Sequence, residues 1–549
     1  MADLSQIETV IVVLMENRSF DHMLGYLSHS QYGNRSKVKG QQNDAGWLAR
    51  FTNEHNGERQ QPFHMDWLAL NGDPPHERLN VRDQLGGDFS KGKPYPMTGF
   101  MKSYASNALV PKVAWREVMG FFTPNEAPIT AFLADNYAIC DHWFAPLPAS
   151  TQPNRLMAMA GFTKIDNTRS DTVPNQDLVY DWCGKQKTRT VKWRVYHEGW
   201  PFFMVMNKWR LAIVEDAIAG GGHFRSLDKF EEDLKTDRDF PQLVFVEPKY
   251  TDDHFSAALP SDDHAPTTIS GGQAFLRRIY CALTTANPER WRRTVMIITY
   301  DENGGMFDHV SPPELETAIV DNAGESFHTL GVRVPALVVS PLVRAGGVYN
   351  GVLDHTSILK FIGQVFGDRQ YYSDEVNKRP LVGSVADVLA NPDCRVDQIR
   401  DDRPQPPPFT PKDSFVKGRS YQPVAPNAEA FAYALRMMQQ ESNDRAAKKF
   451  PELASFLTAR ENLLWELARA QIHSKGCKLG DCERELRVFL EDEENKLVRD
   501  MSLAPVAYAN LSAMINKMVA EARAGGSSVI NSADFLTSLP QSRSLFDRT

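Results

Sequence analysis

The sequence predicts an α/β fold, with a mostly parallel central sheet covered by helices on both faces, followed by a separate helical region. Apolar runs without polar alternation, at residues 9–15 and 295–300, are typical of buried parallel strands. Segments with helical spacing lie between such runs, and this alternation is typical of α/β proteins. After the proline-rich residues 403–408, the composition shifts to Ala, Leu, Glu, Lys and Met with helical spacing.

In chain order, the first apolar run opens the sheet, and residues 30–112, rich in Gly, Asn, Pro and Arg, form long excursions over its edge. A helix is expected over residues 125–139 and a strand over 139–144, which leads into a loop at 148–155. The apolar residues that follow this loop begin another helix. The loop should therefore lie at a helix N-terminus, where backbone amides favour a bound phosphate.

The second half of the chain continues the alternation and then changes character. Further strands are expected at residues 191–196, 243–246, 295–300 and 334–341, and further helices at 272–284 and from 354 onward. The compositional shift predicts two domains, a sheet-containing domain over residues 1–426 and a helical domain over residues 427–549.

The overall composition excludes several classes of protein. With 549 residues, 42% hydrophobic and 24% charged, the chain has an ordinary globular composition, and its net charge of −8 gives no support to a nucleic-acid partner. Six dispersed cysteines do not form a disulfide framework, and we expect free thiols even at the close pair Cys477 and Cys482. No stretch reaches the length of a membrane span and no signal peptide is recognisable, so we expect a cytoplasmic protein or export without a cleaved leader.

One residue of the loop, Thr151, is the strongest candidate nucleophile. A threonine hydroxyl is inert at neutral pH unless a base or a metal ion takes its proton. Two distant pairs of residues offer oxygen ligands, because Glu16 and Asn17 follow one apolar run and Asp301 and Glu302 follow another. Together with the threonine hydroxyl, they form a hard, all-oxygen ligand set for one divalent cation.

Cleavage of a phosphate ester also requires contacts to the phosphate oxygens and a proton for the leaving oxygen. His76, His197 and His264 are the candidates for these tasks. Two alternatives stay open at this point. His64, twelve residues earlier, competes with His76, and Ser150 competes with the neighbouring threonine as the nucleophile.

Other polar residues near these motifs are expected to have structural roles. Asp308 and His309 should hold the glycine-containing loop at residues 304–305 in shape, and His355 should be structural or solvated, as isolated histidines usually are. Arg155 either binds phosphate or pins the threonine loop through a salt bridge.

Taken together, the ordered motifs resemble a known family between residue 7 and about residue 366. They are Met-Glu-Asn-Arg-Ser-Phe-Asp-His at 15–22, Asp-Pro-Pro-His at 73–76, Val-Met-Gly at 118–120, Thr-Gln-Pro-Asn-Arg at 151–155, Asp-His-Ala-Pro at 263–266, Asp-Glu-Asn-Gly-Gly-Met-Phe-Asp-His-Val at 301–310 and Gly-Val-Arg-Val-Pro at 331–335. The chain resembles the bacterial phosphoesterases that include the non-specific phospholipases C and a related acid phosphatase, within the alkaline phosphatase superfamily.

This resemblance implies a three-layer, alkaline-phosphatase-like catalytic domain that depends on one divalent metal ion, which could be Ca, Zn or Mg. It implies that Glu16, Asn17, Asp301 and Glu302 bind the metal ion and that Thr151 is both its fifth ligand and the nucleophile. It also implies that His76, His197 and His264 surround the phosphate.

The resemblance further implies a phospholipase C that hydrolyses phosphatidylcholine-like glycerophospholipids to diacylglycerol and a phosphorylated head group, through a phosphothreonine intermediate. The phospholipase branch resembles this chain in using threonine, whereas the phosphatase branch uses serine. An acid phosphatase with the same site is the alternative enzyme, and an inactive binding or regulatory protein is the alternative of another class. A phospholipid or phosphate-ester substrate and peripheral membrane contact are the expected partners.

Overall fold

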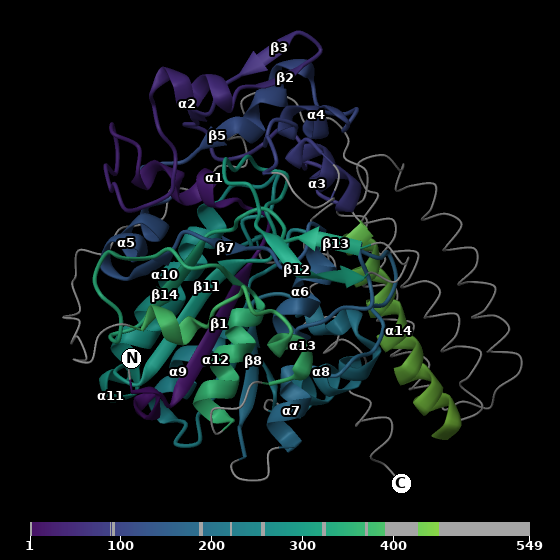
Figure 1. Cartoon of the computed structure of the whole chain (residues 1–549). Helices are drawn as coiled ribbons and strands as arrows, with labels where there is room; N and C mark the ends of the chain where they lie inside the picture. The colour runs from purple at the N-terminus through teal and green to yellow at the C-terminus, as the bar shows by residue number, and fades with distance from the viewer. Residues whose placement is uncertain are drawn as a thin grey trace, which may run out of the picture.

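The computed structural model describes residues 3–449, apart from 88, 90–93, 186–189, 220–221, 254–258, 321–325, 368–371 and 390–425. Within this part of the chain, the centre is an eight-stranded sheet of order β15-β6-β14-β11-β1-β10-β8-β9 (Figure 1). Strand β1 (Thr9–Met15) lies in its middle, parallel to both β10 (Leu243–Glu247) and β11 (Thr294–Tyr300). Every residue of these three strands is buried, as the uninterrupted apolar runs predicted.

The outer strands make the sheet mixed but mostly parallel, which confirms the predicted α/β fold. On one side of β10, strands β8 (Trp193–His197) and β9 (Phe224–Ser226) continue in parallel. On the other side, β14 (Ala336–Val339) is antiparallel to both β11 and β6 (Ala138–Cys140), and β15 (Gly347–Tyr349) is parallel to β6.

Helices cover the sheet in two groups. Helix α6 (Thr151–Ala160) contacts α12 (Thr356–Phe366), while α10 (Ser270–Ala286) contacts α5 (Pro128–Asn136) and α9 (Phe230–Thr236). Figure 1 shows α12 in front of the sheet and α10 behind it. The sheet is therefore the middle of three layers, as expected.

The register of the central strands decides where the polar residues after them lie. In the pairing of β1 with β11, Met15 is opposite Tyr300. The backbone amide of Asp301 then donates a hydrogen bond of 3.1 Å to the carbonyl oxygen of Met15. The residues that follow the two strands consequently emerge side by side at one edge of the sheet, the edge at which parallel strands end.

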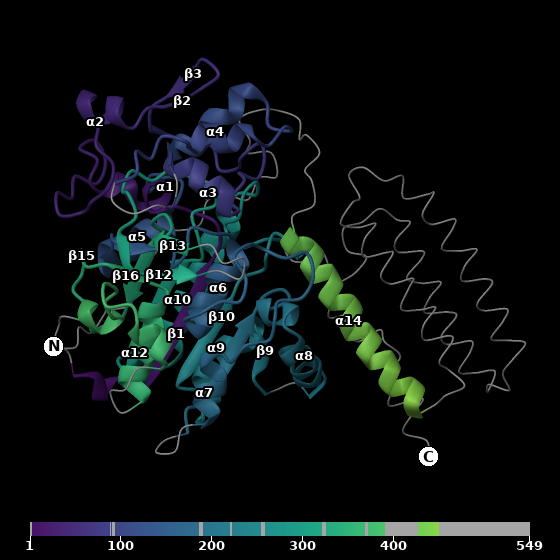
Figure 2. The ribbon, with the colours of Figure 1, turned by 45° about the vertical axis from the view of Figure 1, so that its right-hand side comes forward.

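The segment rich in Gly, Asn and Pro lies beyond these carboxyl ends, at the top of the molecule in Figures 1 and 2. It contains only short elements, which are α2 (Ala45–Arg50), β2 (Asn53–His55), β3 (Glu58–Gln60), β4 (Phe63–His64), α3 (Arg78–Leu85) and α4 (Phe100–Ala105). The predicted excursions are thus confirmed, and they bring residues 73–77 over the end of β1.

Short elements complete the described part of the chain. They are η1 (Leu4–Gln6), α1 (Phe20–Leu24), η2 (Gly25–Leu27), η3 (Lys112–Met119), β5 (Gly120–Phe121), β7 (Trp143–Phe144), α7 (Val179–Lys185), η4 (Phe202–Val205), α8 (Asn207–Ala219), η5 (Leu227–Lys229), α11 (Pro288–Trp291), β12 (Glu314–Val320), β13 (Ser326–Thr329), β16 (Leu353–Asp354), α13 (Asp374–Asn377), η6 (Val385–Val388) and α14 (Pro426–Lys449).

Several predicted elements have different bounds in the structure. The helix expected over residues 125–139 is α5 (Pro128–Asn136), and the helix expected over residues 272–284 is α10 (Ser270–Ala286). The strand expected over residues 139–144 is two strands, because the side chain of Asp141 accepts hydrogen bonds from Lys39 N and Asn350 Nδ2 and interrupts the ladder. Its second part, β7, pairs with β16 in a separate small sheet. The strand expected from residue 334 begins at Ala336, since Pro335 has no amide hydrogen to donate to a ladder.

Helix α14 begins at Pro426, where the second domain was predicted to start. Residues 450–549, with Cys477 and Cys482, and the proline-rich residues 403–408 lie outside the described residues, so the separate folding of residues 427–549 stays a prediction. Cys140 and Cys183 are free thiols, as expected. No helix in the described part of the chain combines the length and the hydropathy that crossing a bilayer requires.

Candidate active site

Four of the five proposed metal ligands, all but Thr151, lie together where β1 and β11 end. Glu16, Asn17, Asp301 and Glu302 are each at most 1% exposed. The backbone amide of Asn17 donates a hydrogen bond of 3.1 Å to Asp301 Oδ1, so one pair of residues is tied directly to the other. Gly304 closes the turn beneath them, because a Cβ atom there would lie 2.3 Å from the carbonyl oxygen of Asn17.

Each of these four side chains keeps a buried oxygen atom that accepts no hydrogen bond from any described residue. The atoms are both Oε atoms of Glu16, Asn17 Oδ1, Asp301 Oδ2 and Glu302 Oε1. Burial of a carboxylate is costly, and it raises the pKa of both Glu16 and Glu302 to about 8. A divalent cation would satisfy these oxygens, so the donor set fits the all-oxygen site that the sequence predicted.

The ligand atoms are not all in contact in this structure. Among the described residues, the acidic and histidine groups whose ligand atoms lie within 4.8 Å of one another include Glu16 with Asp262 and His264, but not Glu16 with Asp301 and Glu302. The guanidinium group of Arg155 accounts for the spacing, because it pairs with Glu16 Oε1 and with Asp301 Oδ2, each at 3.3 Å.

Arg155 also links the helix that carries Thr151, the predicted nucleophile, to these carboxylates. Thr151 is the first residue of α6 and is 3% exposed, and Arg155 lies four residues later, on the same face of that helix. The ion pairs of Arg155 therefore hold the N-terminal turn of α6 against the ends of β1 and β11. Of the two roles left open for Arg155, the structure shows the salt-bridged one.

Ser150, the alternative nucleophile, is fully engaged in hydrogen bonds. Its Oγ atom donates to Glu77 Oε2 at 2.7 Å and accepts from the backbone amide and the hydroxyl of Thr168, both at 2.9 Å. A hydroxyl with one donor and two acceptor positions has no capacity left. This geometry favours Thr151 as the nucleophile.

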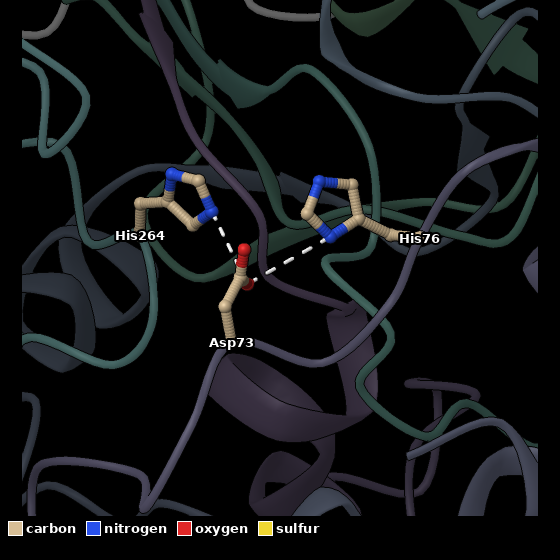
Figure 3. A group of neighbouring side chains, drawn as sticks. All are labelled: Asp73, His76 and His264. Atoms are coloured by element: carbon tan, nitrogen blue, oxygen red, sulfur yellow. Dashed lines mark ion pairs between the residues drawn. The ribbon is translucent and has the colours of Figure 1, made fainter. Parts of the chain in front are cut away.

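Two of the predicted histidines flank a carboxylate that the sequence analysis did not single out (Figure 3). His264 lies with Nδ1 3.2 Å from Glu16 Oε2 and Nε2 3.3 Å from Asp73 Oδ1. His76 lies with Nδ1 3.8 Å from the same Asp73 oxygen and Nε2 3.4 Å from Asn17 Nδ2. The spacing of Asp73 and His76 in Asp-Pro-Pro-His was the signal that could have identified this carboxylate.

The surrounding carboxylates favour the protonated form of both rings. Burial lowers the pKa of His76, but the charges of Glu302 and Asp73 more than offset this and raise the pKa to about 9. Burial likewise opposes the charged form of His264, and Asp73 and Glu16 raise its pKa well above the usual value. Either histidine can therefore be a proton donor at neutral pH.

His64 and His197 lie elsewhere. His64 Nε2 is 3.1 Å from Glu126 Oε2, and β4, which carries it, pairs with β5, so His76 is the histidine at the ends of β1 and β11. His197 ends β8, at the same edge of the sheet but with β10 between β8 and β1. Its Nδ1 atom lies 2.6 Å from the carbonyl oxygen of Gly199, and burial lowers its pKa.

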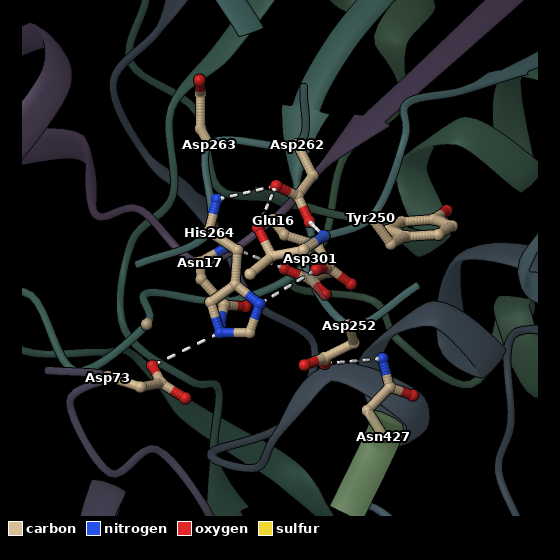
Figure 4. Close-up of polar contacts among 12 residues, drawn as sticks. Glu16, Asn17, Asp73, Tyr250, Asp252, Asp262, Asp263, His264, Asp301 and Asn427 are labelled. Atoms are coloured by element: carbon tan, nitrogen blue, oxygen red, sulfur yellow. Dashed lines mark hydrogen bonds and ion pairs between the residues drawn. The ribbon is translucent and has the colours of Figure 1, made fainter. Parts of the chain in front are cut away.

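Further residues support the site from behind. Tyr250 Oη accepts a hydrogen bond of 2.8 Å from Arg155 Nη1, and His355 Nε2 lies 2.8 Å from the carbonyl oxygen of Asp301. Figure 4 shows Tyr250 beside Asp301 and Glu16. The structural role expected for His355 is thus confirmed, whereas Tyr250 was missed because nothing in its sequence context marks it.

The structural roles expected for Asp308 and His309 are also confirmed. Arg333 pairs with Asp308 Oδ1 at 2.9 Å and with Asp21 Oδ1 at 3.0 Å, and His309 Nδ1 lies 2.6 Å from Asp21 Oδ2. Burial opposes the charged form of Asp21, but His309 and Arg333 hold its pKa below the usual value. This buried network fixes the loop that follows Glu302.

The chain is similar in sequence to several known proteins. The chain is 30% identical to non-specific phospholipase C3 of Arabidopsis thaliana over 410 residues, which cover 70% of this chain and 74% of that protein. It is 27% identical to the non-hemolytic phospholipase C of Burkholderia pseudomallei over 504 residues, 81% of this chain and 66% of that protein. A solved structure from the alkaline phosphatase superfamily, from Vibrio parahaemolyticus, matches with a TM-score of 0.27 and 9% identity over 45% of this chain and 62% of its own.

The model of the phosphoesterase family matches residues 7–367. This range begins before β1 and ends after α12, so it contains the whole central sheet and every candidate residue of the site. The chain therefore belongs to the phosphoesterase family and is a phosphoric-ester hydrolase.

Proposed function

We propose that the chain is a phospholipase C that hydrolyses glycerophospholipids to diacylglycerol and a phosphorylated head group, with Thr151 as the nucleophile. The class of substrate is supported by the relatives named phospholipase C at 25–30% identity, in plants and in bacteria. The threonine in place of a serine, which is typical of the phospholipase branch, supports it as well.

The observation that carries the chemistry is the set of buried oxygens beside α6 that accept no hydrogen bond from the described residues. Glu16, Asn17, Asp301 and Glu302 each offer one, and Arg155 fastens the helix that begins at Thr151 to the same place. A divalent cation held there would lower the pKa of the threonine hydroxyl and offset the charge of a phosphoryl oxygen.

The protein groups have separate tasks in the proposed reaction. The Thr151 hydroxyl, whose pKa the cation would lower, releases its proton to water. Its oxygen attacks phosphorus, and the bond from phosphorus to the glycerol oxygen breaks. His264, held between Glu16 and Asp73, donates its proton to that departing oxygen. The free backbone amides at the start of α6 and the protonated His76 stabilise negative charge on the phosphoryl oxygens.

The second half of the reaction restores the enzyme. Water attacks the phosphothreonine, His264 now takes a proton from that water as a base, and the bond from phosphorus to the Thr151 oxygen breaks. The phosphorylated head group leaves, and the Thr151 oxygen takes back a proton from water, while His264 keeps the proton it has gained for the next turnover. His197, at the same edge of the sheet, is proposed to contact the phosphate when substrate is bound.

One experiment tests the ion and the substrate class together. Elemental analysis of the purified protein should show about one equivalent of Ca, Mg or Zn, with oxygen ligation favouring the first two. Turnover of nitrophenyl phosphorylcholine should exceed turnover of nitrophenyl phosphate. A preference for the monoester would instead assign an acid phosphatase, and metal-loaded protein that cleaves neither ester would indicate a binding protein.

A further inference from the structure

The first turn of α14 lies against α6, the helix that begins at Thr151. The sequence predicted that α14 belongs to a separate helical domain. Figure 2 shows α14 running along the side of the sheet domain, with its first residues next to α6. The helix packs on η4 and α8, and Asn427, its second residue, is 4% exposed. A buried asparagine at such a contact must make hydrogen bonds.

Asn427 makes hydrogen bonds to two segments of the chain, and Figure 4 shows the one to Asp252. Its Oδ1 atom accepts a hydrogen bond of 3.2 Å from Gln152 Nε2, and its Nδ2 atom donates one of 3.1 Å to Asp252 Oδ2. Gln152 directly follows Thr151, and its amide also bonds the backbone of Arg169 in both directions, at 3.0 and 2.9 Å. The side chain of Gln152 is therefore fixed between a loop and α14.

A second contact lies one helical turn further along α14. Phe431 is fully buried, and its ring centroid lies 5.8 Å from that of Tyr250. Tyr250 in turn accepts the hydrogen bond from Arg155, the residue that fastens α6 to the proposed metal ligands. Because Asn427 and Phe431 are four residues apart, one face of α14 supports both the start of α6 and its arginine.

We propose that Asn427 is a positioning residue of the active site, which acts through Gln152 to hold Thr151 in place, so that the beginning of the C-terminal helical region is part of the catalytic unit. The inference rests on the proposed role of Thr151. The geometry gives the reason, since Gln152 has Asn427 as its partner on one side and the backbone of Arg169 on the other. Loss of the Asn427 side chain would leave Gln152, the residue next to Thr151, held only by the backbone of Arg169.

The test uses the full-length, metal-loaded protein with the substitution Asn427→Ala. Displacement of the nucleophile by a fraction of an ångström slows the chemical step but leaves the affinity for substrate nearly unchanged. We therefore expect kcat to fall about 10- to 100-fold while KM changes by less than about threefold. Glu429→Gln is the matched control in the same turn, since Glu429 is half-buried there, and it should keep the wild-type kcat. The ratio of the variant's kcat to that of the wild type is measured on whichever nitrophenyl ester the wild type cleaves. The choice of ester tests the proposed phospholipase C activity, and the ratio tests the role of Asn427.

A double-mutant cycle distinguishes positioning from general support. If Asn427 acts through Gln152, the variant with both Asn427→Ala and Gln152→Ala should lose no more kcat than the more impaired single variant. Asn427→Ser, which keeps a polar group but cannot reach both partners, serves if the alanine variant does not fold. Three outcomes would each overturn the inference. They are an unchanged kcat in folded Asn427→Ala or Asn427→Ser protein, additive losses of kcat in the double variant, and an increase in activity, which an inhibitory contact would give.

Discussion

Replacement of Arg155 by methionine tests the proposed ligand set through stability as well as activity. The guanidinium group is fully buried between Glu16 Oε1 and Asp301 Oδ2, at 3.3 Å from each. Methionine fills much of the same volume but carries no charge. The substitution therefore leaves two buried carboxylates of like charge facing each other, unless another cation compensates for them.

The size of the effect follows from these contacts. Removal of one partner from a buried ion pair costs about 3–5 kcal/mol, because the remaining charge is left unpaired. With an unfolding entropy of about 2.1 cal/mol/K per residue, a cooperative unit of about 400 residues would lose about 4–6 °C in Tm. A divalent cation bound by the two freed carboxylates should restore much of this loss.

The assay is thermal unfolding of Arg155→Met in EDTA and again with excess Ca, Mg or Zn. Arg333→Met is the matched control, since Arg333 is also fully buried between two carboxylates, those of Asp21 and Asp308. Both variants should lose a similar Tm in EDTA, but only Arg155→Met should recover with the cation. An equal response of the two variants to the cation would show that Glu16 and Asp301 are not its ligands.

Three further outcomes are expected. Thr151→Ala should lower kcat by about a thousandfold or more with little change in Tm. Ser150→Ala should lower the free energy of unfolding by about 1 kcal/mol and retain most of the activity. A similar loss of kcat in both variants would refute the assignment of Thr151 as the nucleophile. Asp21→Asn should be less stable than wild type at neutral pH, as measured by the denaturant midpoint, and this difference should vanish on acidification. The reason is that the pKa of Asp21 is lower in the folded protein than in the unfolded chain, where it is about 3.9. The stability that this gives is present above about pH 3.9 and is lost as the pH falls through the pKa of the folded protein. Calorimetric affinity for the cation should rise with pH up to about 8 and then level off, since protons compete for Glu16 and Glu302; a flat profile would exclude these two carboxylates.

Much of the fold could be predicted from the sequence because the central strands are apolar throughout. The runs that became β1 and β11 are buried on both faces, so no polar residue interrupts them, and their ends were fixed by the change to Glu16 and Asp301. The direction of β14 was not predicted. An apolar run carries no information about whether its neighbours are parallel or antiparallel, and β14 is antiparallel to β11.

The site was predictable where chemistry demanded a residue type beside a strand end, and less so where it depends on long-range contacts. Asp73 acts between two histidines that are 188 residues apart in the chain, and only the fold shows that they share it. The place of His197, on a strand separated from β1 by another, likewise depends on strand order. Asn427 could not be found at all, because an asparagine near a helix start reads as an ordinary cap.

The polar groups at the ends of β1 and β11 are arranged for a cation in two independent respects. At least one oxygen of each accepts no hydrogen bond from the described residues, and burial raises the pKa of Glu16 and Glu302 to about 8, so that without compensation part of this ligand set would be protonated at neutral pH. A site whose carboxylates served only stability would have satisfied those oxygens with amides, as Asp308 is satisfied by Arg333 and the amide of Asp21. The contrast between the two buried clusters, one saturated and one with open oxygens, distinguishes the supporting network from the centre that it supports.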